Sequence, residues 1–174
     1  MIKNLILFTL FAGTGIFAQN NLVENGDFKQ KSKHWYVSKK DVGQFIFVPA
    51  DKPDAPYLKI TGADKPDGYA RISNHLKLSA DNSLKPGDSV TIKAKIKCEK
   101  LSGKFQIMLR QANAKGKSLN YTGITLRKRY KCNWKEFSAK AKILNNTARI
   151  YVYIISRYLS KQDTVYVKDI TLEK

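Results

Sequence analysis

The segment from Val90 to Cys98 alternates apolar and polar residues more cleanly than any other part of the chain. Its apolar residues share one parity: Val90, Ile92, Ala94, Ile96 and Cys98. Threonine and lysine occupy the positions between them. A period of two is typical of a β-strand with one face in the core and the other in water. The turn sequence LKPGD at residues 84–88 comes directly before this segment and supports its start as a strand.

The same alternation recurs in short runs separated by Gly, Pro, Asn and Asp. These runs are residues 41–48, 57–60, 69–73, 104–110, 148–155 and 164–172. No segment of comparable length has the 3.6-residue period of a helix. Strands at roughly ten-residue spacing predict an all-β fold. We expect a two-sheet antiparallel β-sandwich of the jelly-roll type.

Residues 1–18 have the features of a signal peptide. Lys3 is the one charge in this stretch, an apolar run extends to Phe17, and Ala18 precedes the polar residues Gln19 and Asn20. We therefore expect residues 19–174 to form one domain that is secreted, periplasmic or displayed at the cell surface. No later segment is long and apolar enough to span a bilayer as a helix.

The chain carries 32 Lys and Arg against 14 Asp and Glu, a formal net charge of +18. Such an excess favours anionic partners, among them acidic polysaccharides and lipid head groups. Nucleic acid is the least available of these partners to an exported protein, and we do not expect it as a ligand. The alternative is a surface that is basic only for solubility.

Parity also selects a candidate binding face. Ile150, Val152 and Ile154 share the inward parity, which directs Tyr151 and Tyr153 outward. If the neighbouring strands lie in the same sheet, one face carries the candidate ligand-binding residues Tyr69, Arg71, Gln106, Met108, Arg110, Tyr151 and Tyr153. Aromatic rings suit sugar rings, and guanidinium groups suit carboxylate or sulfate. The alternative is that residues 113–121 fold over this face as a loop and make it a second small core.

The run of basic residues Arg127, Lys128 and Arg129 is a second candidate, for contact with a polyanion. A solvated charge run in a loop or edge strand explains it equally well. The two candidates therefore predict a sugar-binding face and a separate basic segment.

Catalytic motifs are missing from the sequence. His34 and His75 have no Cys or acidic neighbour at metal-ligand spacing, and no pair of carboxylates stands out for glycoside hydrolysis. We therefore expect a non-catalytic binding protein. One alternative is a cell-surface interaction or adhesion protein that uses the same face. Another is a small polysaccharide lyase, which could work with Tyr and Arg alone.

The two cysteines permit a disulfide in an exported protein. Cys98 has the inward parity, whereas counting back from Phe137 directs Cys132 outward. A bulge near Trp134 would reset that phase. The sequence leaves the Cys98–Cys132 disulfide open.

Four segments resemble, in order and spacing, the motifs of carbohydrate-binding modules of the family 4/9 type. They are NLVENGDF at residues 21–28 followed by Trp35, LKPGDSV at 84–90, NWKEF at 133–137, and VYVKDITL at 165–172. The resemblance covers the chain beyond the leader and implies a galactose-binding-like jelly roll that binds a glycan without catalysis. The arginines of the candidate face favour an acidic glycan as the ligand.

The resemblance also implies roles for single residues. Phe28, Trp35 and Trp134 would be core aromatics. The structural calcium of many such modules would be lost here, because Lys29 and Lys168 stand where the family has acidic ligands. We therefore expect no metal or cofactor, and expect Asp27 and Asp169 to pair with these lysines.

Overall fold

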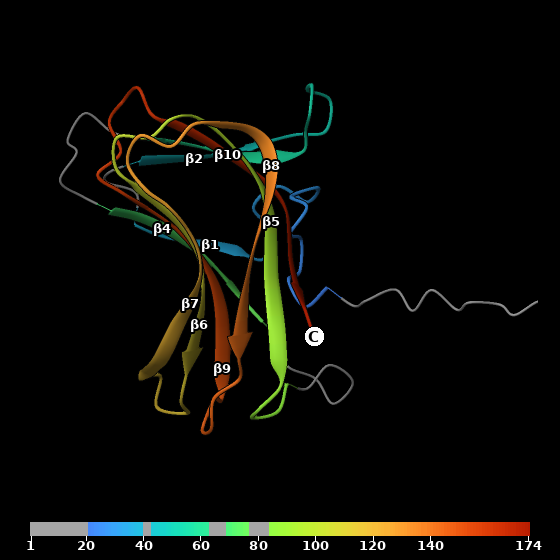
Figure 1. The fold of residues 1–174 in the computed structure, drawn as a ribbon. Helices are drawn as coiled ribbons and strands as arrows, with labels where there is room; N and C mark the ends of the chain where they lie inside the picture. The colour runs from blue at the N-terminus through green and yellow to red at the C-terminus, as the bar shows by residue number, and fades with distance from the viewer. Residues whose placement is uncertain (1–20, 40–42, 63–68, 77–83) are drawn as a thin grey trace, which may run out of the picture.

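The computed structural model describes residues 21–39, 43–62, 69–76 and 84–174, so the predicted signal peptide lies outside the described residues. The strands in chain order are β1 (Trp35–Lys39), β2 (Gly43–Val48), β3 (Tyr57–Gly62), β4 (Tyr69–His75), β5 (Ser89–Lys100), β6 (Lys104–Ala112), β7 (Ser118–Leu126), β8 (Cys132–Lys142), β9 (Arg149–Arg157) and β10 (Thr164–Glu173). They form two five-stranded sheets, in the orders β1-β4-β9-β6-β7 and β2-β3-β10-β5-β8 (Figure 1). The predicted antiparallel jelly-roll sandwich is confirmed. Within these residues no helix is long and apolar enough to cross a membrane.

Alternation along the strands builds the core between the sheets. In β5 the residues of one parity, from Val90 to Cys98, are at most 1% exposed. In β9 the inward residues Ile150, Val152 and Ile154 are at most 2% exposed. Both strands therefore bury the face that their sequence pattern predicts.

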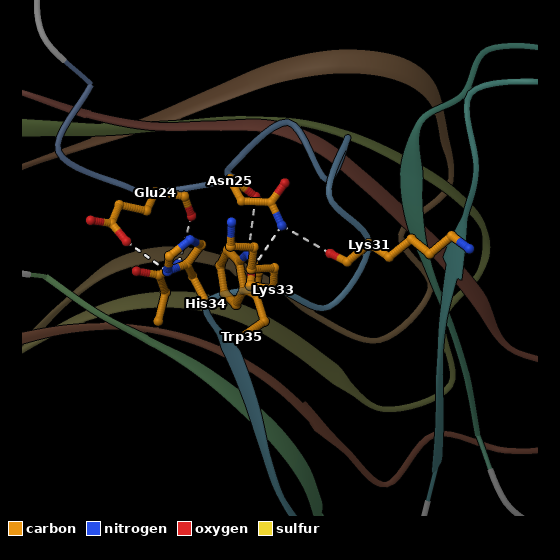
Figure 2. A network of polar contacts seen from close by, with 7 residues as sticks. Glu24, Asn25, Lys31, Lys33, His34 and Trp35 are labelled. Carbon is orange, nitrogen blue, oxygen red and sulfur yellow. Dashed lines mark hydrogen bonds and ion pairs between the residues drawn. The ribbon is translucent and has the colours of Figure 1, made fainter.

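The Asn-Gly-Asp-Phe motif at residues 25–28 shapes the N-terminal segment through hydrogen bonds of Asn25. The Asn25 amide donates to the carbonyls of Lys31 at 2.9 Å and Lys33 at 2.8 Å, and the Trp35 indole donates to the Asn25 carbonyl at 3.0 Å (Figure 2). These bonds fold the segment so that Phe28 and Trp35 enter the core, with ring centroids 5.3 Å apart and exposures of 1% and 4%. The predicted core positions of both rings are confirmed.

The two ends of the described chain lie side by side (Figure 1). The Leu22 amide donates to the Leu172 carbonyl at 3.0 Å, and the Ile170 amide donates to the Gly26 carbonyl at 2.9 Å. A Cβ atom at Gly26 would lie 2.0 Å from the Ile170 carbonyl oxygen. The close approach of the first segment to β10 therefore requires glycine at this position.

A bulge in β8 changes the phase of the alternation at Cys132. Ile96 faces Lys135 and Cys98 faces Cys132, so two steps along β5 match three along β8. As a result Cys132 packs against the core. Trp134 lies outside the core, against Tyr57 and Tyr166 of the outer face at centroid distances of 6.1 and 6.4 Å. The core position that the family resemblance implied for Trp134 is wrong, because Trp134 has the parity opposite to Phe137, whose ring packs against the core.

The two cysteines face each other across β5 and β8. Both are free thiols in this structure, so the disulfide that the sequence left open is not formed in it. The Cys98 side chain is fully buried, and its burial raises the pKa of the thiol to about 12. The thiolate needed for disulfide chemistry is therefore scarce at neutral pH.

Candidate functional site

The outward face of the β1-β4-β9-β6-β7 sheet carries the predicted ligand-binding residues, and we call it the tyrosine face. Register across β4, β9 and β6 sorts them into rows. The rows are Tyr69–Arg157–Lys104, Arg71–Ile155–Gln106, Ser73–Tyr153–Met108 and His75–Tyr151–Arg110. The face thus alternates tyrosines and cations over neighbouring strands.

A hollow of about 310 Å³ lies on this face, and we call it the central hollow. Its lining comes from four strands: Tyr69 and Arg71 of β4, Lys104, Gln106 and Met108 of β6, Tyr121 of β7, and Tyr153, Ile155 and Arg157 of β9. Three of these nine residues are basic and none is acidic. Its volume suits a small ligand or one unit of a polymer.

Tyr153 lies at the centre of this arrangement. The Arg71 guanidinium lies over its ring at 4.9 Å, and Arg110 Nη1 donates to its hydroxyl at 2.9 Å. The rings of Tyr151 and Tyr121 lie on either side, at 5.9 and 6.4 Å. These neighbours leave Tyr153 only 6% exposed. Tyr153 therefore lies on the outward face, as its parity predicts, but its ring is held by its neighbours and does not project into solvent.

The Arg110 guanidinium makes its hydrogen bonds within the protein. Besides Tyr153, its guanidinium donates to Ser118 Oγ at 2.8 Å and to the Gly116 carbonyl at 2.6 Å. Arg110 and Tyr151 do not line the central hollow. The geometry therefore gives Arg110 a positioning role, in which it fixes the Tyr153 ring and the turn between β6 and β7.

Aromatic rings continue from the hollow towards β1. Tyr153 and Tyr151 are followed by His75, 4.5 Å from Tyr151, and by Tyr36, 5.2 Å from His75. A second hollow of about 440 Å³ lies beside His75 and Tyr151. Burial, helped by the charge of Arg110, lowers the pKa of His75, which favours a neutral imidazole at pH 7. An extended ligand would meet a row of rings across the whole sheet.

Several lining residues were missed from the sequence. Lys104 and Arg157 have the same parity as the predicted residues of β6 and β9, so continuing the alternation to the strand ends would have found them. Tyr121 had no such signal, because residues 113–121 were expected only as a loop, whereas β7 begins at Ser118. The face is therefore extended by this strand rather than covered by a loop.

The cations of the hollow differ in what they contact. The Arg157 guanidinium lies over the Tyr69 ring at 5.5 Å. Within the described part of the chain, no carboxylate lies within ion-pair distance of Lys104 or Arg157. Their charge is therefore available to an anionic group placed in the hollow.

The predicted polyanion segment is the turn between β7 and β8. Arg127, Lys128 and Arg129 are all exposed and do not line the central hollow. The Arg129 backbone amide donates to the Leu101 carbonyl at 2.8 Å, which fixes this turn against the turn between β5 and β6.

The residues at the inferred calcium position make other contacts. Lys29 pairs with Asp27 at 3.0 Å, as expected. The expected pair of Lys168 with Asp169 is wrong: Lys168 donates to the Asp54 carbonyl at 2.9 Å, and Asp169 pairs with Lys95 at 3.0 Å. Across the ranges that the structure describes, no cluster of three His, Cys, Asp or Glu side chains could hold a metal ion. The loss of the calcium site stays a prediction, which rests on lysine at two positions where calcium would need oxygen ligands.

The fold defines a class: a β-sandwich of the kind that carbohydrate-binding modules use. A module of carbohydrate-binding family 16 aligns with a TM-score of 0.63 and 16% identity over 88% of this chain and 100% of its own. A family 61 module in complex with β-1,4-galactotriose aligns at 0.56 and 16%, over 89% and 99%.

The enzymatically active domain of tailspike protein 4 from bacteriophage CBA120 aligns at 0.64 and 11% identity over 88% of this chain, which spans 21% of the tailspike domain. No protein-family model and no curated protein sequence matches. At these identities the likeness shows the fold, and the family 4/9 resemblance stays a prediction.

Proposed function

We propose that this protein is an exported, non-catalytic module that binds a glycan on its tyrosine face, and that the glycan is anionic. One observation carries the proposal. The central hollow combines tyrosine rings with Arg71, Lys104 and Arg157, and none of its lining residues in the described part of the chain is acidic. Tyrosine rings can pack against the apolar faces of sugars, while the cations pair with carboxylate or sulfate.

The fold supports the glycan part of this proposal. Family 16, 22 and 61 carbohydrate-binding modules share the sandwich, and one of them is described with a bound galactotriose. The row of rings from Tyr121 to Tyr36 supports an extended chain rather than a lone sugar, because Tyr121 and Tyr36, at the two ends of the row, are both exposed.

The charges support the anionic part. Lys104 and Arg157 have no carboxylate within ion-pair distance among the described residues, and a neutral glycan would gain nothing from their charges. Leaving these two cations side by side costs repulsion. An acidic sugar would relieve that repulsion on binding. The predicted signal peptide is consistent with a ligand met outside the cytoplasm.

A glycan array followed by calorimetry tests the proposal. The wild type should bind one or more uronate-containing or sulfated glycans more tightly than their neutral counterparts. The double variant Lys104→Met/Arg157→Met should lose about ten-fold or more of that affinity, since each lost charge contact is worth a few-fold. The control Lys140→Met/Lys142→Met removes the same charge from exposed positions on the other sheet and should bind like the wild type.

Three results would contradict the proposal. Absence of binding to any glycan would favour the interaction-protein alternative. Equal affinity for charged and neutral forms would refute an anionic ligand. New absorbance from unsaturated chain ends would show a lyase instead of a binding module.

A further inference from the structure

Three turns meet at one end of the sandwich, and we call this region the basic end. They are residues 101–103 between β5 and β6, 127–131 between β7 and β8, and 158–163 between β9 and β10. Asp163 accepts hydrogen bonds from the backbone amides of Ser102 at 3.0 Å and Ser160 at 2.9 Å. The Arg129 amide donates to Leu101 at 2.8 Å. The three turns are thus fixed to one another.

Charge at this end is strongly one-sided. Residues 100–104, 127–131 and 157–163 include eight basic residues: Lys100, Lys104, Arg127, Lys128, Arg129, Lys131, Arg157 and Lys161. The one acidic residue in these stretches, Asp163, is fully buried and occupied by the two serines. These three stretches therefore present cations to solvent and keep their one carboxylate buried.

The basic end is continuous with the central hollow. Lys104 and Arg157 face each other across β6 and β9 and line the hollow, and they also border the turns. Phe105 faces Leu126 across β6 and β7, so the next residue, Arg127, begins opposite Lys104. A chain that leaves the hollow past Lys104 therefore reaches the turn at residues 127–131.

An aromatic ring stands among these charges. Tyr158, which follows Arg157, is 58% exposed and has a φ of 57°. A positive φ is unfavourable for a tyrosine, so the surrounding structure holds this backbone in place. An exposed ring on this backbone, next to Arg157 in the chain, is a second surface on which a sugar could stack.

We propose that the basic end is a second contact region for a long anionic polysaccharide whose chain begins in the central hollow. The polymer would cross Lys104 and Arg157, stack on Tyr158 and pair its negative groups with the turn at residues 127–131. This inference rests on the proposed function and adds the class of ligand: a polyanion that is longer than the hollow. Affinity should then rise with chain length, because each added unit brings a new contact.

The test uses the full mature chain with polygalacturonate, alginate and chondroitin sulfate, each as a disaccharide and as a long oligomer. For the acidic glycan that binds, the long oligomer should bind about ten-fold tighter than the disaccharide at low salt. The triple variant Arg127→Gln/Lys128→Gln/Arg129→Gln should lose most of this gain and keep the disaccharide affinity. Tyr158→Ala should lower affinity for the long oligomer by several-fold even in high salt, since stacking is not screened.

A matched control removes three exposed cations from the opposite end of the sandwich: Lys115→Gln/Lys117→Gln/Lys142→Gln. It should bind both lengths like the wild type. If the disaccharide binds but the long oligomer binds no tighter, or if both triple variants lose equal affinity, the inference is overturned while the proposed function stands. If no glycan of either length binds, both fail together.

Discussion

Replacing Arg110 with methionine separates a residue that shapes the site from one that contacts the ligand. Methionine keeps an apolar stem and removes three hydrogen bonds, to Ser118, Gly116 and Tyr153 at 2.8, 2.6 and 2.9 Å. Each such bond contributes about 0.5–1.5 kcal/mol net. Because the guanidinium is only partly buried, we take the lower part of that range and expect a loss of about 2 kcal/mol in the free energy of unfolding.

Urea and thermal unfolding measure this loss. For a domain of this size about 2 kcal/mol lowers Tm by about 4–8 °C. Arg149→Met is the control, because Arg149 is an exposed arginine at the start of β9, and its Tm should stay close to that of the wild type. Arg110→Lys should be almost as unstable as Arg110→Met, because lysine keeps the charge but lacks the planar fork of donors.

A double-mutant cycle with Tyr153→Phe gives the sharpest version of the test. This substitution removes only the hydroxyl that accepts the bond from Arg110. A coupling of about 0.5–1.5 kcal/mol between the two sites is expected. Zero coupling, together with an Arg110→Met variant as stable as the Arg149→Met control, would refute the positioning role and return Arg110 to the set of ligand contacts.

Three further outcomes follow from other parts of the structure. Gly26→Ala should lower the free energy of unfolding by about 3 kcal/mol or more, because its Cβ would collide with a backbone carbonyl. Gly87→Ala should cost only about 1 kcal/mol, because Gly87 has open space around it and a φ of +89°. Equal losses in urea unfolding would contradict this reasoning. The 2.6 Å hydrogen bond from Lys93 lowers the pKa of Glu173, so the stabilisation from this pair is present above the ordinary carboxyl pKa and is lost as pH falls through the lowered value. Glu173→Gln should therefore flatten the acid side of a curve of Tm against pH. An unchanged curve would count against a stabilising role of this pair. The Cys98 thiol, with a pKa of about 12, should react with a thiol reagent only after denaturation; rapid reaction of the native protein would show that the thiol is accessible.

Alternation made the sandwich predictable because it is a local property. In β5 and β9 each residue's face follows from its neighbours two positions away, so the buried sides of both strands could be assigned from sequence. The bulge in β8 is different, because it depends on the register with β5. Cys132 lies beyond this irregularity, and its position followed only from its pairing with Cys98.

The sequence predicted which residues share the tyrosine face, because strand parity determines the face. It did not predict the hydrogen bonds and exposure of those residues, because these depend on contacts between strands and turns. Parity placed Tyr69, Arg71 and Tyr153 on one face, and they do line one hollow. It could not show that Arg110 donates to a neighbouring turn, nor that Tyr153 is covered by the groups around it. Hydrogen bonds between strands and turns depend on distances that no sequence period encodes.

The distribution of charge between the two sheets distinguishes a ligand-binding surface from a generally basic one. On the outer face of β5, Lys93, Lys95 and Lys97 each lie within 4.0 Å of a carboxylate, so their charges are largely offset. On the tyrosine face, Lys104 and Arg157 have no carboxylate at that distance among the residues that the structure describes. A surface that was basic only for solubility would give no reason for the lysines of β5 to be paired while Lys104 and Arg157 have no such partner among the described residues. These two cations lie where tyrosine rings line a hollow, and an anionic sugar would use both features.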